Sequence, residues 1–125
     1  MDSPQDLRYT DSHEWVKQEA DGTVTMGLSA HAQEALGEIV YLELPDAGKA
    51  YARGDAFALV ESVKSASDIY IPVAGEITDV NQAVQAEPGS INQQPYEAWL
   101  VRIKPDNISE LDSLLSAQDY QRSLG

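Results

Sequence analysis

The clearest candidate for chemistry in this sequence is Lys64, the lysine of the segment ESVKSASDIY at residues 61–70. Runs of apolar residues at 56–60 and 69–73 predict β-strands on either side of it. We therefore expect Lys64 at the tip of a β-hairpin, where its four-carbon stem carries a nucleophilic amine into solvent. Another enzyme could acylate such an amine, although most surface lysines have no specific role.

The other three lysines of the chain each have an ordinary structural explanation. Lys17 alternates with its neighbours along a predicted strand, Lys49 lies in a predicted turn, and Lys104 ends the last predicted strand. Lys64 differs because the residues that follow it, at 65–67, are all small and leave room for a docking enzyme. This comparison favours Lys64 as the modified residue.

The chain offers few other groups for catalysis or metal binding. It contains no cysteine, which excludes disulfides, thiolate metal sites and cysteine nucleophiles. Its two histidines, His13 and His31, leave little for a histidine-based metal site, and the sequence has no G-x-S-x-G motif or phosphate-binding glycine loop. We expect no catalytic residues and no metal site.

The charge of the chain restricts its partners. Its 8 basic and 21 acidic residues give a formal net charge of −13, which argues against binding to nucleic acid or to an anionic membrane and suits contact with basic protein surfaces. No apolar run approaches transmembrane length, and the polar, acidic N-terminus resembles neither a secretory signal nor a transit peptide. We expect a cytoplasmic protein, bacterial in origin.

Turn signals divide the rest of the chain into short elements. A β-hairpin is predicted over 15–28, with its turn at Asp21-Gly22, and a short helix over 29–36. Further strands are expected at 37–44, 76–80 and 99–103, and a looser segment at 82–94. These elements predict an all-β fold, a flattened barrel or sandwich with helices only at its margins.

The C-terminal region has the spacing of a helix. Leu111, Leu114 and Leu115 would share one helical face, and Ser109 with Asp112 forms a variant capping box. We expect a helix from about residue 109 to residue 120 that packs on the sheet. At 125 residues the whole chain, 1–125, fits a single domain.

ESVKSASDIY is similar to the lipoyl-lysine motif of the glycine cleavage system H proteins, and other segments resemble signatures of that family in the expected order. These are 13–16, 26–29, 31–33, 36–40, 43–45, 72–77, 80–81, Asn92, 95–96 and 99–100. The resemblance implies a barrel-sandwich hybrid fold, like that of lipoyl domains, and a single lipoyl-carrier domain. It also implies (R)-lipoate in amide linkage on Lys64.

The resemblance further implies a carrier that shuttles an aminomethyl group and catalyses nothing itself. Its expected partners are glycine decarboxylase (P protein), which is pyridoxal-phosphate-dependent, aminomethyltransferase (T protein) and dihydrolipoyl dehydrogenase (L protein). Enzymes that attach the lipoyl group are also expected partners. A tethered arm makes such delivery efficient because it replaces free encounters with transfer from a docked surface.

A cargo amine on the arm is cationic when protonated and needs shelter from water. Carboxylates and hydroxyls near the arm's resting place would provide it. We expect Glu14, Ser12 and Asp68 to line such an arm pocket. The alternative for the two acidic residues is ordinary surface acidity.

Other carrier classes fit less well. Biotinyl domains usually flank their lysine with methionines, where this chain has Val63 and Ser65, and lipoyl domains of 2-oxo acid dehydrogenases usually have aspartate before it. A lipoyl relay to other proteins and an unmodified acidic interaction module remain alternatives. The chain departs from the H-protein pattern at 95–99, where a glycine-containing insert is shortened, and at Ser65, where alanine is commoner.

Overall fold

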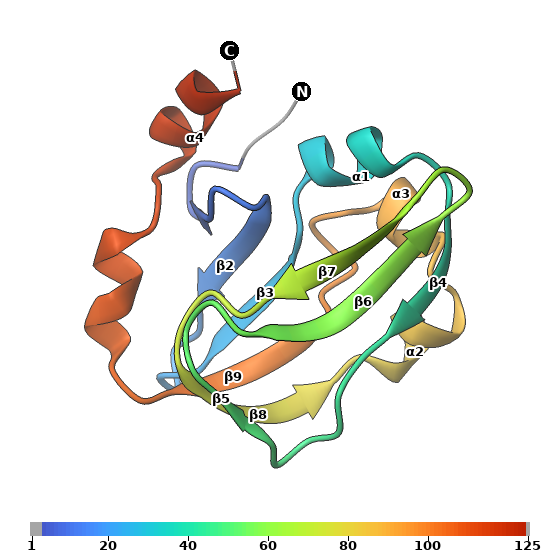
Figure 1. Ribbon diagram of the computed structural model, residues 1–125. Helices are drawn as coiled ribbons and strands as arrows, with labels where there is room; N and C mark the ends of the chain where they lie inside the picture. The colour runs from blue at the N-terminus through green and yellow to red at the C-terminus, as the bar shows by residue number, and fades with distance from the viewer. Residues whose placement is uncertain (1–3, 125) are drawn as a thin grey trace.

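The computed structural model describes residues 4–124, which form two antiparallel β-sheets with short helices at their margins (Figure 1). Sheet A has the order β1 (Arg8–Tyr9), β2 (Glu14–Gln18), β3 (Val24–Leu28), β9 (Val101–Pro105), β8 (Gly75–Val80) and β5 (Ala50–Tyr51). Sheet B has the order β4 (Ile39–Glu43), β6 (Ala56–Ser62) and β7 (Ala66–Tyr70). The predicted all-β, barrel-sandwich type of fold is confirmed, and the two sheets do not close into a barrel.

The two sheets enclose one main hydrophobic core. β3 is buried along its whole length, β6 buries Phe57 and Val60, and β7 buries Ile69. The pairing of β6 with β7 shifts register between Ala56 and Ala58, so β6 does not keep the strict two-residue period of a regular strand. The core includes Val24, Met26, Ile77, Ile103, Leu42, Phe57, Val60 and Ile69.

The first hairpin and the first helix match the sequence-based expectations. β2 and β3 pair around a turn in which Gly22 has a φ of 90°, a value that favours glycine. Helix α1 (Ala30–Leu36) begins at Ser29, whose side chain accepts a hydrogen bond from the Ala32 backbone N–H, and ends at Gly37 with φ 83°. Local turn and cap chemistry therefore determines these boundaries.

The segment 82–94, expected to be loose, contains two short helices, α2 (Gln82–Ala86) and α3 (Ser90–Gln93). Each buries one apolar side chain, Val84 in α2 and Ile91 in α3. Pro88 and Gly89 lie between them. The burial of these two side chains stabilises turns that have little helical propensity of their own.

The C-terminal helix predicted over 109–120 is divided in two. A 3₁₀-helix, η1 (Ile108–Ser113), is followed by extended backbone and then by helix α4 (Ala117–Ser123). The division arises because the backbone of Leu115 pairs with Tyr9, with two N–H···O bonds of 2.8 Å. The cap of η1 is Asn107 rather than the predicted pair at 109 and 112, and Ser116 caps α4.

Candidate functional site

Lys64 lies at the tip of the β6–β7 hairpin, as predicted. Glu61 pairs with Ala66, and the turn between the strands runs from Ser62 to Ser65. The Ser62 hydroxyl accepts hydrogen bonds from the backbone N–H groups of Lys64, at 3.2 Å, and of Ser65, at 3.1 Å. One serine side chain thus holds the N–H groups of Lys64 and Ser65 and leaves the Lys64 side chain exposed.

The tip is attached to the segment that joins α1 to β4. The backbone N–H of Val63 donates to the carbonyl oxygen of Glu38 at 3.0 Å. The Lys64 stem lies against Gly37, so closely that a β-carbon at Gly37 would be 2.9 Å from the Lys64 Cε. Gly37 therefore serves the hairpin as well as the end of the helix, since its missing side chain leaves room for the lysine.

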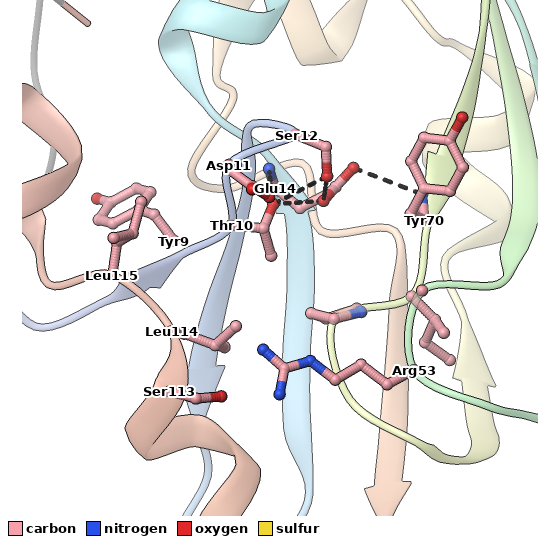
Figure 2. A pocket seen from close by; sticks show the side chains of 13 residues that line it. Tyr9, Thr10, Asp11, Ser12, Glu14, Arg53, Tyr70, Ser113, Leu114 and Leu115 are labelled. Carbon is pink, nitrogen blue, oxygen red and sulfur yellow. Dashed lines mark hydrogen bonds between the residues drawn. The ribbon is translucent and has the colours of Figure 1, made fainter. Parts of the chain in front are cut away.

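A cavity of about 240 Å³ opens at the far end of β7 from the tip (Figure 2). Glu14 and Ser12 line it from the start of β2, and Tyr70 lines it from the end of β7. Arg53, from the loop before β6, and Leu114, after η1, are also in its wall. The cavity therefore lies where both sheets and the C-terminal segment meet.

Glu14 is the buried charged group of this cavity, with only 2 % of its surface exposed. Its Oε1 accepts hydrogen bonds from the hydroxyls of Thr10, at 2.5 Å, and Ser12, at 2.6 Å (Figure 2). Its Oε2 accepts only a long contact of 3.5 Å from the Tyr70 backbone N–H. One carboxylate oxygen is therefore well bonded, and the other keeps capacity to accept a further hydrogen bond.

Burial raises the pKa of Glu14, and the hydrogen bonds from Ser12, Thr10 and the Tyr70 backbone reduce this rise without reversing it. A carboxyl whose pKa is higher in the folded protein than in the unfolded protein stabilises the fold when the pH is below the unfolded-state pKa. This stabilisation is lost as the pH rises through the folded-state pKa. Ionised Glu14 therefore costs stability at neutral pH.

This cost predicts that Glu14→Gln stabilises the protein at neutral pH. Glutamine keeps an oxygen that can accept from Thr10 and Ser12 but has no charge to bury. The gain in unfolding free energy should shrink as the pH falls towards 4.5, the ordinary pKa of this carboxyl. Urea unfolding of both proteins between pH 4 and pH 8 measures this gain, and a variant less stable than wild type at neutral pH would contradict the prediction.

A tight turn places Ser12 and Glu14 side by side. Thr10 closes it, because its hydroxyl accepts from the Glu14 backbone N–H at 3.0 Å while donating to the same residue's carboxylate. His13, at the centre, has a φ of 73°, unusual for a residue with a side chain. Its Nδ1 lies 2.9 Å from the Tyr120 hydroxyl, which holds this strained residue against α4.

The structure brings Ser12 and Glu14 together but does not place Asp68 with them. Asp68 is exposed on β7, opposite Leu59, and lines a separate cavity of about 400 Å³ beside Glu43. Along β7 it stands between Lys64 and Tyr70, and its side chain shares a face with that of Tyr70 because they are two residues apart. Asp68 thus lies on the strand that connects the tip to the Glu14 cavity.

Sequence reasoning missed Thr10, His13, Tyr70 and Arg53 as parts of this site. His13 belonged to a recognised signature, 13–16, but nothing in its type indicated a strained backbone. Thr10 precedes Glu14 by four residues, a spacing that becomes meaningful only with the turn between them. Tyr70 and Arg53 reach the cavity through tertiary packing, for which the sequence carries no local signal.

Within residues 4–124, no group of three or more histidine, cysteine, aspartate or glutamate side chains could hold a metal ion. No helix in the same range has the length and apolar character needed to cross a membrane. What the described chain does present is an exposed primary amine at the tip of a hairpin and, at the other end of the same strand, a cavity with a buried carboxylate.

Comparison with known proteins assigns this arrangement to a family. Residues 7–125 match the family model described as glycine cleavage H-protein. The glycine cleavage system H protein of Paraburkholderia xenovorans is 54% identical over 125 residues, which cover 100% of this chain and 99% of the relative. That of a Psychrobacter species is 55% identical over 122 residues, which cover 97% of each chain.

A solved structure gives the same result. The crystal structure of a glycine cleavage system H protein from Mycobacterium marinum superimposes with a TM-score of 0.89 at 37% sequence identity, over 98% of this chain and 99% of that one. The sequence and the fold thus agree over nearly the full length. The chain belongs to the glycine cleavage H-protein family, the lipoate-carrying shuttle proteins of the glycine cleavage system.

Proposed function

We propose that Lys64 carries (R)-lipoate in amide linkage and that the protein uses this arm to shuttle the aminomethyl group of glycine. The observation that carries the proposal is the position of Lys64 at the exposed tip of a hairpin whose turn is held by hydrogen bonds to the Ser62 hydroxyl. Lys17 and Lys104 lie within strands of sheet A, and Lys49 lies in the connection before β5. Lys64 is thus the lysine best placed to enter another enzyme's active site.

The residues present fit such an arm. The small residues at 65–67 leave the amine accessible, and the amide bond would remove the charge of Lys64 at a place where its stem already lies along Gly37. When bound, the lipoyl group supplies the sulfur to which the aminomethyl cargo is attached. The chain's own part is to tether that group, present it to partner enzymes and shelter the cargo.

The Glu14 cavity is the proposed shelter. A protonated cargo amine is a cation, and Glu14 offers it a buried carboxylate whose Oε2 retains acceptor capacity. Ser12 fixes the other oxygen of the same carboxylate at 2.6 Å. We assign Asp68 to the path of the arm along β7, because its exposed carboxylate lies between the tip and the cavity.

The proposed partners are the P, T and L proteins of the glycine cleavage system together with the enzymes that attach the lipoyl group. The chain acts as a single carrier domain, an inference supported by sheet A, which combines strands from both ends of the sequence. A cytoplasmic location, expected from the sequence, suits these partners, and the relatives named above are bacterial.

Peptide mass mapping tests the attachment site. After expression with an active lipoylation pathway, the peptide that contains Lys64 should gain the mass of one lipoyl group. Peptides that contain Lys17, Lys49 or Lys104 should remain unmodified and serve as internal controls. An unmodified Lys64 would overturn the proposal. A lipoyl adduct on another lysine would then move the tether to that residue, and the absence of any adduct would favour the acidic interaction module.

A further inference from the structure

Asn92 is half-buried on α3, and its side chain makes three hydrogen bonds. Its Oδ1 accepts from the backbone N–H of Ile39 at 2.9 Å. Its Nδ2 donates to the carbonyl oxygen of Gly37 at 2.7 Å and to Oε1 of Gln33 at 3.0 Å. One amide group therefore holds both ends of the segment 37–39, accepting at Ile39 and donating at Gly37, and its second donated bond goes to α1 at Gln33.

The segment held by Asn92 is the one that holds the hairpin tip. Glu38 lies between Gly37 and Ile39. Its carbonyl oxygen accepts from the N–H of Val63, the residue before Lys64. Among the hydrogen bonds that residues 63–65 make within the described chain, this is the one that leaves the turn; the others remain within Ser62–Ser65. The Lys64 stem meets the same segment at Gly37.

We propose that Asn92 is a positioning residue for Lys64, which fixes the segment 37–39 so that the hairpin tip presents its lysine in one orientation. The proposal rests on Lys64 as the attachment site. Asn92 itself touches neither the lysine nor the arm, and it acts through Gly37 and Glu38.

Losing this support should affect docking rather than chemistry. Without Asn92 the segment 37–39 has fewer partners, and the tip samples several orientations, of which a lipoylating enzyme accepts one. The apparent KM for the protein then rises in inverse proportion to the competent fraction, while kcat, measured after docking, stays the same. Loss of one or two hydrogen bonds corresponds to roughly a five- to tenfold change.

Asn81 supplies a matched control. It is also half-buried, its Nδ2 donates to the carbonyl oxygen of Trp99 at 2.9 Å, and its Oδ1 accepts from the N–H of Val84. Its Oδ1 thus caps its own helix, α2, and its Nδ2 joins that helix to residue 99, so it also links two segments through a side-chain amide. The segments that it joins, around 81–84 and 99, do not include the hairpin tip.

The experiment uses the full, unlipoylated chain as substrate for a lipoate–protein ligase, with lipoate and ATP. For Asn92→Ala we expect KM to rise about five- to tenfold with kcat within about twofold, and amide hydrogen exchange of Val63 to speed up by a similar factor. Asn92→Asp keeps the acceptor for Ile39 but loses both donated bonds, so it should show the same changes in KM and in exchange. It serves as the test if Asn92→Ala folds poorly. Asn81→Ala should change neither quantity.

Two results would overturn the inference: an unchanged KM in both Asn92 variants, or an equal rise in KM with Asn81→Ala, which would indicate general loosening. Mass mapping of the wild-type product separates this failure from that of the proposed function. If Lys64 is lipoylated and the Asn92 variants behave like wild type, only the positioning role is lost.

Discussion

Replacing Lys64 with arginine is expected to abolish lipoylation and, with it, the release of CO2 from glycine in a system reconstituted with the partner enzymes. Arginine keeps the positive charge and nearly the length of lysine, but its guanidinium stays protonated and does not form the amide. The backbone of the turn is held by Ser62, so the hairpin should survive the change. Intact-mass analysis and CO2 release measure the two losses.

The three other lysines provide the controls for this experiment. Lys17→Arg, Lys49→Arg and Lys104→Arg each preserve charge at exposed positions away from the tip. Each variant should gain one lipoyl group and support CO2 release at the wild-type level. Residual CO2 release by Lys64→Arg, or its loss in one of the three controls, would place the tether on another lysine.

The hairpin that carries Lys64 was predictable because its signals are local. Strand-forming residues surround a short polar segment, and the same kind of local signal identified the turn at Gly22 and the caps of α1 at Ser29 and Gly37. In each case the residue type determines the backbone geometry directly. Long-range packing then stabilises these elements, and their observed boundaries lie within a few residues of the predicted ones.

The C-terminal helix was predicted with the wrong extent because a distant strand competes for its backbone. The leucine spacing at 111–115 satisfies a helix, but Leu115 pairs with Tyr9, about a hundred residues earlier in the chain, and this requires extended backbone. Tyr9 also stacks on Tyr120, with ring centroids 4.5 Å apart, which fixes α4 over β1. No local pattern contains either contact.

The candidate site likewise contains residues that local sequence predicts and residues that only the fold brings in. Ser12 and Glu14 were predicted together, and one turn of the chain does bring them together. The walls contributed by Tyr70 and Arg53 come from the opposite sheet and its loops, so only the fold reveals them. Asp68, predicted from its closeness to Lys64 in the sequence, lies outside the Glu14 cavity because β7 carries it to a different part of the surface.

Replacing Glu14 with glutamine is expected to speed the loss of the aminomethyl cargo, as formaldehyde, from the loaded arm. A charge-assisted hydrogen bond between the carboxylate and the protonated cargo amine contributes about 1.5–3 kcal/mol, which corresponds to roughly a ten- to hundredfold change in rate. Formaldehyde release from the loaded protein, in the absence of the aminomethyltransferase, measures this rate directly.

Two neighbouring variants make the assignment specific. Ser12→Ala removes one donor to the Glu14 carboxylate but leaves the charge, so its effect should be the smaller. Asp68→Asn removes a carboxylate of the same chain that lies outside the cavity, and the loaded arm should lose its cargo at close to the wild-type rate. If Asp68→Asn had the larger effect, the shelter would lie along the exposed face of β7 instead.

The dependence on pH distinguishes the charge of Glu14 from its shape. Because burial raises the pKa of Glu14, the carboxylate becomes protonated at a higher pH than an exposed glutamate would, and the attraction to the cargo amine is then lost. The ratio of the Glu14→Gln rate to the wild-type rate should therefore be largest near neutral pH, where the carboxylate is ionised and the cargo amine is protonated, and approach one in acid. A ratio that stays constant with pH would mean that the side chain acts by filling space.

The same substitution is thus expected to stabilise the fold at neutral pH and to weaken retention of the cargo. Both effects have one cause, since a carboxylate that is costly to bury without a counter-ion is well suited to bind a cation that arrives later. Glu14 carries that cost in the unloaded protein with hydroxyl partners but no positive charge bonded to it among the described residues. A variant that gained stability and still retained its cargo would separate the two effects and remove Glu14 from the shelter.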